Sequence, residues 1–285
     1  MNKKAFTILL FFCSFSFGLS QIEKDLWIFG KGASLKFDSR VAKPYALSDD
    51  FLINSPEAAA TGIDKNGNLL FYSDGVNIWN SKHKLIYKNL LGSQNATQGI
   101  SFFPDPDNDK LFLLVTAHTS AFQDGSYLYK LDFTNSLDGE VSNLITPLDS
   151  SAKSYERVEI VKHFNKKDIW VVLNPHLTDN SYYLVYLYKD GKIYYKDKYK
   201  SRMKRNFNKG YLTVSNDQNI LVSTDYDGNE IEFALFDNGT GTIDTTAVLS
   251  TSVFETGVYG VEFSENSKYL YLTTYEIDAN NQDSF

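Results

Sequence analysis

The sequence predicts an all-β fold in which four-stranded sheets are repeated around an axis, a β-propeller. Three observations predict it: a strand–turn–strand pattern recurs along the chain, aromatic residues are frequent, and short turn motifs occur throughout. The 21 Phe and 19 Tyr suit the half-buried surface of a sheet. A single four-stranded sheet cannot bury both of its faces, so repeated sheets must stack on their neighbours.

The recurring unit is a polar start, an alternating apolar strand, a tight turn and a second strand. It returns at intervals of roughly 40–60 residues, a period typical of propeller blades. The five units span residues 61–72, 100–113, 160–172, 211–223 and 260–272.

A further strand is predicted after each of the first four units, as a blade requires. These segments are 76–79, 126–133, 182–188 and 231–236, and an early strand at 26–29 is expected to help close the ring. The fifth unit lacks its outer strands, so either the chain is a fragment or an N-terminal strand completes that blade. We expect seven blades in the complete form, with five or six visible here.

Asn-Gly and Asp-Gly pairs separate the predicted strands. They supply the positive φ angles that tight hairpins need, and their density leaves little room for long helices. The pairs are Asn66-Gly67, Asp74-Gly75, Asp124-Gly125, Asp138-Gly139, Asp190-Gly191, Asp227-Gly228 and Asn238-Gly239.

Residues 1–20 are predicted to be a signal peptide. Lys3 and Lys4 precede an apolar run over 6–17, and small residues at 18 and 20 mark a cleavage site before Gln21. The run is short for a bilayer, although an uncleaved anchor remains the alternative. We therefore expect residues 21–285 to form an exported propeller domain, secreted or at the cell surface, with no membrane span after cleavage.

Charge and cysteine content narrow the class of protein further. The only cysteine, Cys13, lies in the signal peptide, so disulfides, cysteine-bound zinc and cysteine nucleophiles are excluded from the mature chain. The net charge of −7 argues against binding to nucleic acid or an anionic membrane. We expect a monomer.

Several short motifs carry a family resemblance. They lie at 27–30, 67–75 with 78–80, 162–163 with 168–172, 210–212 and 259–264. Together they resemble secreted β-propeller proteins of Bacteroidota with WD40- or YVTN-like repeats, whose larger members carry adhesion-type domains and a type IX secretion sorting tail. The resemblance implies a cell-surface role in adhesion and supplies no catalytic residues. This chain shows neither an immunoglobulin-like repeat nor a sorting domain, so the export route beyond the inner membrane is left open.

No metal or cofactor is expected. Residues 105–109 place carboxylates at alternate positions, as a calcium loop does, but Lys110 and Thr116 occupy the sixth and twelfth positions, where glycine and an acid are needed. A turn between two strands is favoured there. No phosphate-binding loop, dinucleotide motif or G-x-S-x-G motif is present.

The four histidines, at 83, 118, 163 and 176, form none of the close pairs that build zinc sites. His163 lies on a predicted inner strand, so we expect it to face the central channel. His118, His176 and Glu156 could form a second group on one face, although ordinary hydrogen-bonded histidines at strand ends are favoured.

Residues 189–209 are basic and rich in tyrosine within an acidic chain. Cations with stacking aromatics suit a polyanion or a carbohydrate. The alternative, which the pattern favours, is an outer strand whose lysines protect an exposed edge. The candidate ligand-binding residues are Lys196, Lys198, Lys200, Arg202, Lys204, Arg205, Tyr195 and Tyr199.

Two functions follow from the sequence. The first is a binding or scaffold module for a protein or carbohydrate at the cell surface, without catalysis. The alternative is an extracellular hydrolase or lyase acting on glycans, with His163 and nearby acidic residues as the catalytic groups. Acidic and histidine side chains that converge within hydrogen-bond reach at the channel would favour the enzyme.

Overall fold

The computed structural model describes residues 26–38, 41, 43–48, 50–119, 125–142, 145–149, 156–175, 181–203, 209–226, 230–250, 257–274, 276–277 and 283–284. The predicted signal peptide at 1–20 lies outside these residues and stays a prediction. In the described part, no helix has the length and apolar character that crossing a membrane requires.

All regular structure in these ranges is β, which confirms the predicted fold class. Four antiparallel sheets carry four or more strands. The first holds β3 (Ala60–Ile63), β4 (Leu69–Ser73), β5 (Asn77–Asn80) and β6 (Leu85–Lys88). The second holds β7 (Ile100–Asp105), β8 (Asn108–Thr116), β9 (Ser126–Asp132) and β10 (Glu140–Val141), with β11 (Thr146–Asp149) also paired to β9.

The third and fourth sheets repeat this order. The third holds β12 (Val158–Lys162), β13 (Ile169–Leu173), β14 (Tyr182–Lys189) and β15 (Lys192–Lys200). The fourth holds β16 (Leu212–Val214), β17 (Ile220–Asp225), β18 (Glu230–Asp237) and β19 (Thr242–Ser250). Two-stranded sheets are formed by β1 (Leu26–Phe29) with β2 (Ala33–Lys36), β20 (Val258–Phe263) with β21 (Leu270–Thr274), and β22 (Glu276–Ile277) with β23 (Asp283–Ser284).

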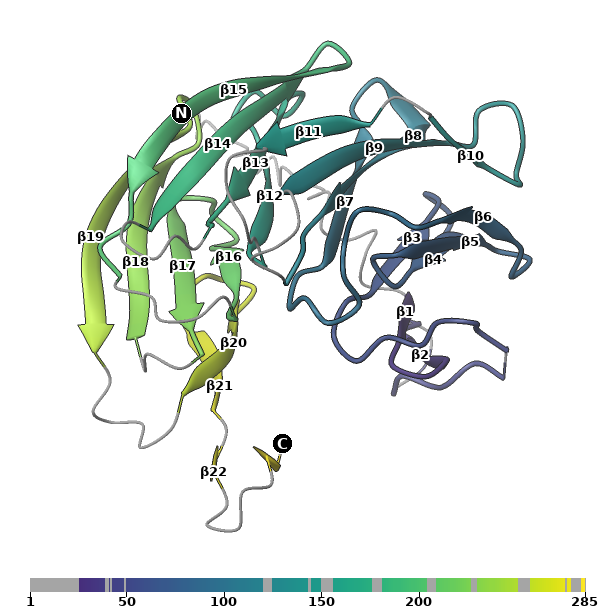
Figure 1. The fold of residues 1–285 in the computed structure, drawn as a ribbon, viewed down its shortest axis with the longest axis horizontal. Coiled ribbons are helices and arrows are strands. Elements are labelled where there is room, and N and C mark those ends of the chain that lie inside the picture. Colours follow the sequence, from purple (N-terminus) through teal and green to yellow (C-terminus); the bar gives the residue numbers. More distant parts are fainter. Residues whose placement is uncertain are drawn as a thin grey trace, which may run out of the picture.

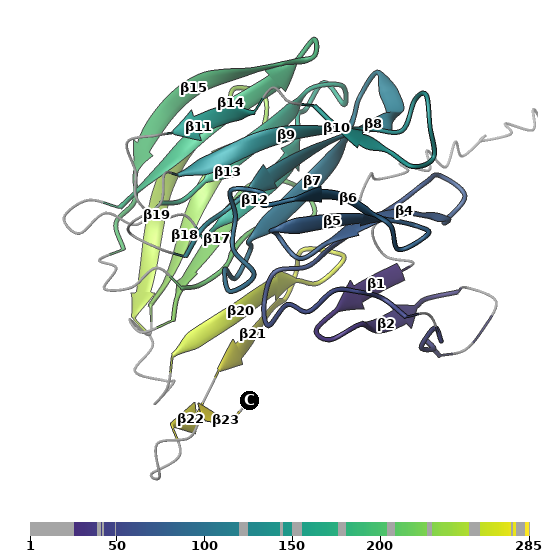
Figure 2. The same cartoon turned by 45° about the vertical axis from the view of Figure 1, so that its right-hand side comes forward.

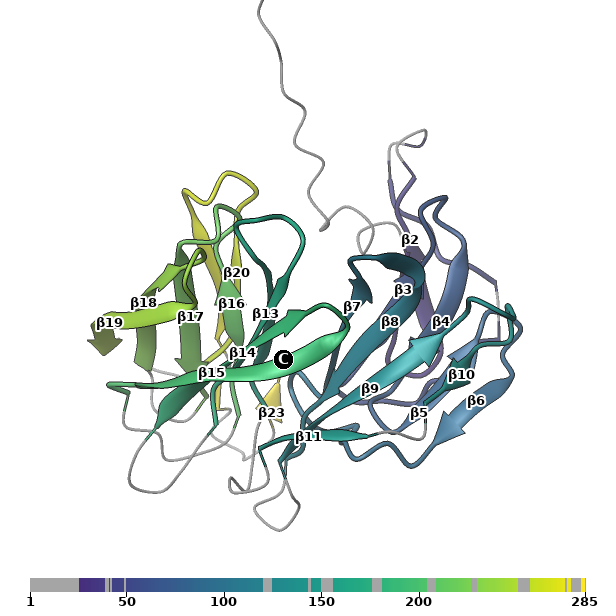
Figure 3. The same ribbon diagram turned by 90° about the horizontal axis from the view of Figure 1, so that it is seen from above.

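The sheets follow one another in chain order along an arc, as blades do (Figure 1). The first strands β3, β7, β12, β16 and β20 lie toward the centre, while β15 and β19 lie on the outside. Figure 2 shows β1–β2 beyond the first sheet and β20–β21 beyond the fourth. Seen from above, β6 and β19 lie at opposite edges of the molecule (Figure 3).

All five predicted strand–turn–strand units are confirmed as the antiparallel pairs β3–β4, β7–β8, β12–β13, β16–β17 and β20–β21. The predicted outer strands are the third strands β5, β9, β14 and β18. The basic segment contains β15, a fourth and outermost strand, as the edge interpretation expects. Among the described residues the fifth unit is two-stranded, and the count of seven blades stays a prediction.

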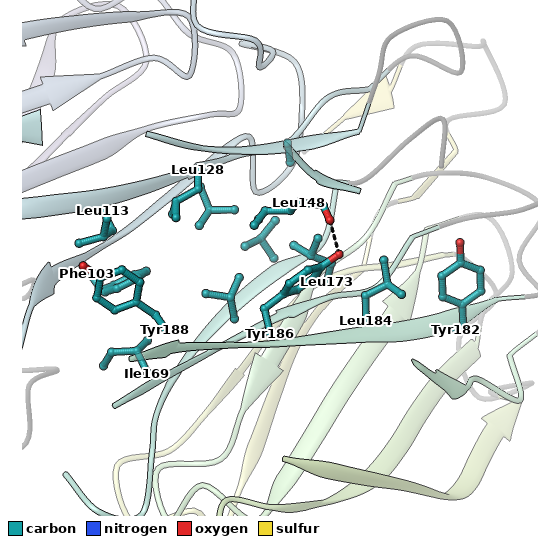
Figure 4. Packing of buried hydrophobic residues seen from close by; sticks show 14 residues of the cluster. Phe103, Leu113, Leu128, Leu148, Ile169, Leu173, Tyr182, Leu184, Tyr186 and Tyr188 are labelled. Atoms are coloured by element: carbon teal, nitrogen blue, oxygen red, sulfur yellow. Dashed lines mark hydrogen bonds between the residues drawn. The ribbon is translucent and has the colours of Figure 1, made fainter. Parts of the chain in front are cut away.

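The core lies between successive sheets rather than inside any one of them. Alternate residues of β14 face opposite ways: Tyr186 and Tyr188 pack toward the second sheet, whereas Tyr183 and Val185 pack toward the fourth. The hydroxyl of Tyr186 donates to the carbonyl of Leu148, the contact drawn in Figure 4. Burying both faces of each sheet in this way is what requires the radial stack.

One predicted turn differs from expectation. Asp190 and Gly191 both have positive φ, 49° and 73°, as a tight hairpin needs. Gly239, however, is not among the positive-φ residues, and Gly241 takes that role at 73°. The predicted Asn238-Gly239 turn is wrong in detail: the amides of Thr240 and Gly241 both donate to the Asp237 carbonyl, so the turn extends to Gly241. A Cβ at Gly241 would also lie 2.7 Å from the ring of Trp170.

Candidate functional site

The inner strands begin at one end of the molecule, where side chains from separate sheets meet. We call Glu57, Thr97, Glu156, Tyr211 and Tyr259 the axial cluster. Glu57, Thr97, Glu156 and Tyr211 lie just before β3, β7, β12 and β16, and Tyr259 lies near the start of β20. Five segments that are distant in sequence therefore contribute to one site.

Hydrogen bonds connect four members of the axial cluster. The Tyr259 hydroxyl donates to Glu57 Oε2 at 3.0 Å and lies 3.1 Å from Thr97 Oγ1. Thr97 Oγ1 lies at hydrogen-bond distance, 2.9 Å, from Glu156 Oε2, and the Thr97 amide approaches the same oxygen at 3.4 Å. Two carboxyl groups are thus linked through two hydroxyl groups.

A second link confirms that the strands meet around an axis. Gln98 Nε2 donates to the Leu212 carbonyl and Gln98 Oε1 accepts from the Leu212 amide, both at 2.9 Å. Gln98 precedes the second sheet and Leu212 begins the fourth, so the bonded residues belong to sheets that are not neighbours in chain order.

Arg157, the residue after Glu156, binds backbone carbonyl groups next to the axial cluster. Its side chain is fully buried, and Nε donates to the Thr224 carbonyl at 3.1 Å while Nη2 donates to the Lys209 carbonyl. Nη2 also lies 3.8 Å from Asp225 Oδ1. Gly210 has φ of 144°, and a Cβ there would stand 2.2 Å from the Thr224 carbonyl oxygen. Only glycine fits between these groups.

The rim of the cluster is open to solvent and aromatic. Lys209 is about half exposed, with its Nζ 4.0 Å from Glu57 Oε1 and 5.6 Å from the ring of Tyr226. Tyr211 and Tyr226 each meet Tyr259 edge to face, at centroid distances of 5.7 and 5.5 Å. A ligand at this rim would meet one carboxylate, phenol groups and one ammonium.

Burial raises the pKa of three side chains in the axial cluster. It raises the pKa of Glu156, against the opposing effect of the Thr97 hydrogen bonds and Arg157. Burial also raises the pKa of Tyr211 and of Tyr259, so both phenols stay protonated at neutral pH. Burial therefore favours the protonated form of Glu156.

The cluster supports proton transfer and hydrogen bonding to hydroxyl groups. Carboxylates accept, tyrosine and threonine hydroxyls both donate and accept, and a carboxyl group with a raised pKa can act as a general acid or base. No group of three or more acidic, histidine or cysteine side chains suited to a metal ion occurs among the residues described.

His163 does not join the axial cluster. It follows β12 in the turn to β13, where its Nδ1 accepts from the Asn165 amide at 2.9 Å and its ring stacks on Trp170 at 5.0 Å. Glu156 lies before the other end of β12, about 20 Å away at the usual rise of a strand. The expectation that His163 faces the channel stays a prediction.

The other histidines are placed as follows. His118 comes after β8 at the same end as Glu156, since the Ala117 amide donates to the Gly99 carbonyl beside the start of β7. Burial lowers the pKa of His118. His176 lies outside the described residues, so its grouping with Glu156 stays a prediction. His83 lies in the β5–β6 turn, with Nδ1 3.1 Å from the Tyr72 hydroxyl.

The basic candidates of β15 are divided between its two faces. Tyr195, Lys198 and Lys200 pair with Tyr186, Leu184 and Tyr182 and share their face, whereas Tyr199 pairs with Tyr183 on the other face. Lys196 lies at the bulge in the register, and Arg202 follows the strand. Lys198 Nζ stands 3.6 Å over the Tyr182 ring. Lys204 and Arg205 lie outside the described residues.

The calcium-like motif is a turn, as the sequence favours. Asp105 ends β7, Asn108 begins β8, and the Asp107 amide donates to Asp105 Oδ1 at 2.9 Å. The Asp105 carboxyl group thus accepts a hydrogen bond from within its own turn.

Sequence reasoning missed Glu57, Thr97, Tyr211 and Tyr259 as members of one site. The signal that could have found them is positional: polar residues recur just before or at the start of each predicted inner strand. In a propeller those positions converge, however far apart they are in the chain.

Comparison with known proteins identifies the fold. No protein-family model matches the chain, and no curated protein is detectably similar in sequence. The periplasmic gluconolactonase of Pseudomonas aeruginosa matches in structure with a TM-score of 0.58 and 12% identity, over 89% of this chain and 75% of that one. The hydrazine synthase of Kuenenia stuttgartiensis matches with a TM-score of 0.54 and 13% identity, over 91% and 76%. A protein from Lactobacillus plantarum matches at 0.51 and 13%, over 91% and 80%.

At these identities the comparison shows a shared β-propeller fold, similar to lactonase and YVTN-like propellers, and nothing more.

Proposed function

We propose that this protein is an exported β-propeller that binds a small, hydroxyl-rich ligand at the axial cluster. The observation that carries the proposal is the convergence of Glu57, Thr97, Glu156 and Tyr259 from different sheets into one hydrogen-bonded group with a partly exposed rim. The predicted signal peptide supports export, and the acid–tyrosine chemistry supports a sugar or a sugar derivative as the ligand.

The local chemistry favours an uncharged ligand over a phosphorylated one. A phosphate group requires available cations. The guanidinium of Arg157 is fully buried and bonded to backbone carbonyls, and Lys209 lies beside Glu57. The partly exposed carboxyl group of Glu57 at the same rim would repel a phosphate.

Binding can be tested by calorimetric titration with neutral sugars, sugar lactones and sugar phosphates. We expect a neutral compound to bind the mature protein, and Glu156→Gln and Tyr259→Phe to weaken that binding about tenfold or more, because the first replaces the carboxyl group by a carboxamide and the second removes the hydroxyl group. Lys192→Gln, on the outermost strand, is the matched control and should bind like wild type. Equal affinity in all four proteins would place the ligand elsewhere, and no binding by any neutral compound would contradict the proposed ligand class.

The second candidate function is hydrolysis of a sugar lactone or a glycosidic bond. It is favoured by the two linked carboxyl groups and by the structural likeness to a gluconolactonase. The test is acid release from gluconolactone at constant pH, corrected for spontaneous hydrolysis. Turnover that is lost in both Glu156→Gln and Glu57→Gln would establish the enzyme, whereas binding without turnover would leave the binding module.

A further inference from the structure

We propose that Glu156, Thr97, Tyr259 and Glu57 form a hydrogen-bonded relay in which the two carboxyl groups share a single proton. The relay has three links: Glu156 Oε2 to Thr97 Oγ1 at 2.9 Å, Thr97 Oγ1 to Tyr259 Oη at 3.1 Å, and Tyr259 Oη to Glu57 Oε2 at 3.0 Å. All three distances are those of ordinary hydrogen bonds.

The proton count carries the inference. With both carboxyl groups ionised, only the two hydroxyl protons of Thr97 and Tyr259 remain for three links. If each hydroxyl donates to its neighbouring carboxylate, no proton is left for the 3.1 Å contact between the two hydroxyl oxygens. One additional proton satisfies every link.

Two arrangements use that proton equally well. In the first, Glu156 donates to Thr97, Thr97 donates to Tyr259, and Tyr259 donates to ionised Glu57. In the second, each proton has moved one link along, so that Glu57 is protonated and Glu156 is ionised. The number of protons is the same in both, and only the end that carries the charge differs.

The surroundings place the proton on Glu156. Its residue is 2% exposed, whereas the Glu57 side chain is 25% exposed and lies 4.0 Å from the Lys209 ammonium. Solvent and Lys209 therefore stabilise a negative charge on Glu57, while burial disfavours one on Glu156.

The other charged groups near the relay do not reverse this assignment. Arg157 follows Glu156 directly and favours its ionised form, but the guanidinium points to the carbonyls of Thr224 and Lys209 and to Asp225. Tyr211, one of two tyrosines whose rings meet Tyr259 edge to face, is a phenol that stays neutral.

The relay would also affect how the axial cluster recognises a ligand, a consequence that rests on the proposed function. A singly protonated pair presents one carboxylic acid and one carboxylate, the combination that general acid–base chemistry and recognition of a hydroxyl group both use. A cationic ligand would instead favour loss of the shared proton.

The test is a pH titration of the Glu156 carboxyl carbon by NMR in ligand-free protein labelled at glutamate, with the signal assigned from Glu156→Gln. In wild type, Glu156 should remain protonated at a pH where exposed glutamates are ionised. Glu57→Gln should lower its titration midpoint, because a carboxamide can donate to Tyr259 and turn the relay toward an ionised Glu156.

Loss of a like charge at Glu57 would lower the midpoint as well, so the hydroxyl links must be cut separately. In Tyr259→Phe or Thr97→Val protein, Glu57→Gln should lower the Glu156 midpoint by clearly less than in wild type, because only the loss of the like charge then remains. Thr97→Val serves if the tyrosine variant does not fold. Tyr211→Phe removes a neighbouring hydroxyl outside the relay and should leave the effect of Glu57→Gln intact.

Two results would overturn the relay. One is a Glu156 that ionises together with exposed glutamates in wild type. The other is an effect of Glu57→Gln that is equal with and without the Tyr259 and Thr97 hydroxyls. Because no ligand is present, either result would leave the binding proposal to its own experiment.

Discussion

The axial cluster and the outermost strand β15 both combine charged side chains with tyrosines, but their environments differ. In β15 they are consecutive in sequence, exposed, and divided between two faces. In the axial cluster they come from five separate segments, and Glu156 and Thr97 are buried.

The difference matters because charge has different consequences in the two places. A charged side chain in water contributes little to stability, since solvent screens it and ordering it costs entropy. A buried charge must be paired or hydrogen-bonded, so removing its partner is costly. Substitutions near the axis should therefore have large effects, and matching substitutions in β15 should have small ones.

The largest effect is expected for Arg157→Leu. This change removes the buried guanidinium from the Thr224 and Lys209 carbonyls and from Asp225, which is itself fully buried. Breaking a buried ion pair from one side costs about 3–5 kcal/mol. Urea denaturation of the mature protein measures the loss, with Lys192→Gln on β15 as control. A cost no larger than that of the control would show that Arg157 does not hold the axial backbone together.

Gly210→Ala should have the next largest effect. The new Cβ would stand 2.2 Å from the Thr224 carbonyl oxygen and 2.7 Å from Arg157 Nη2, at a φ that side chains rarely adopt. We expect a loss of about 2–3 kcal/mol in the free energy of unfolding, from strain and displacement together. Gly191→Ala is the matched control, because its Cβ position is open although its φ is also positive. A similar cost at both positions would attribute the effect to φ alone.

The sequence predicted the fold because the blade is a local pattern. Alternating strands and tight turns lie within a few dozen residues of one another, so units such as 160–172 identify β12 and β13 directly. The outermost strand β15 was also predictable, since an exposed edge strand carries lysines.

The axial cluster was not predictable in the same way. Nothing near Glu57 in sequence indicates Tyr259, 202 positions away, and their contact exists only once the blades are placed around an axis. For His163, the sequence pattern located the inner strand but not its last residue: β12 ends at Lys162, and His163 begins the turn to β13.

A smaller effect is expected from pH. Because burial raises the pKa of Glu156 above its ordinary value of 4.5, the folded chain binds this proton more tightly than the unfolded chain. Its contribution to stability is fully present below the unfolded-state pKa and is lost as the pH rises through the folded-state pKa.

The stability of wild type relative to Glu156→Gln should accordingly fall with rising pH over that window. One proton limits the slope to about 1.4 kcal/mol per pH unit. Urea denaturation of both proteins at a series of pH values from about 4 to 8 measures the difference, with Glu265→Gln in an exposed turn as control. A difference that does not change with pH would show that Glu156 titrates alike in the folded and unfolded chains.

The smallest effect on folding is expected from neutralising β15. Lys192, Lys196 and Lys200 are exposed, so changing all three to glutamine should alter the free energy of unfolding by no more than about 0.5 kcal/mol. Adding Lys198→Gln should cost about 0.5 kcal/mol more, because it removes the ammonium from the Tyr182 ring.

The same variants separate the two roles of the basic strand. If the lysines protect an exposed edge, their loss should increase self-association, measured by light scattering, because an uncharged outer strand can pair with another chain. Retention on immobilised heparin should then be unchanged across a salt gradient, since the cations of β15 do not form one patch. Elution at markedly lower salt would instead assign β15 a polyanion or acidic polysaccharide as its ligand. The molecule would then have two binding regions: the axial cluster, whose residues come from separate segments, and β15, whose residues are consecutive in sequence.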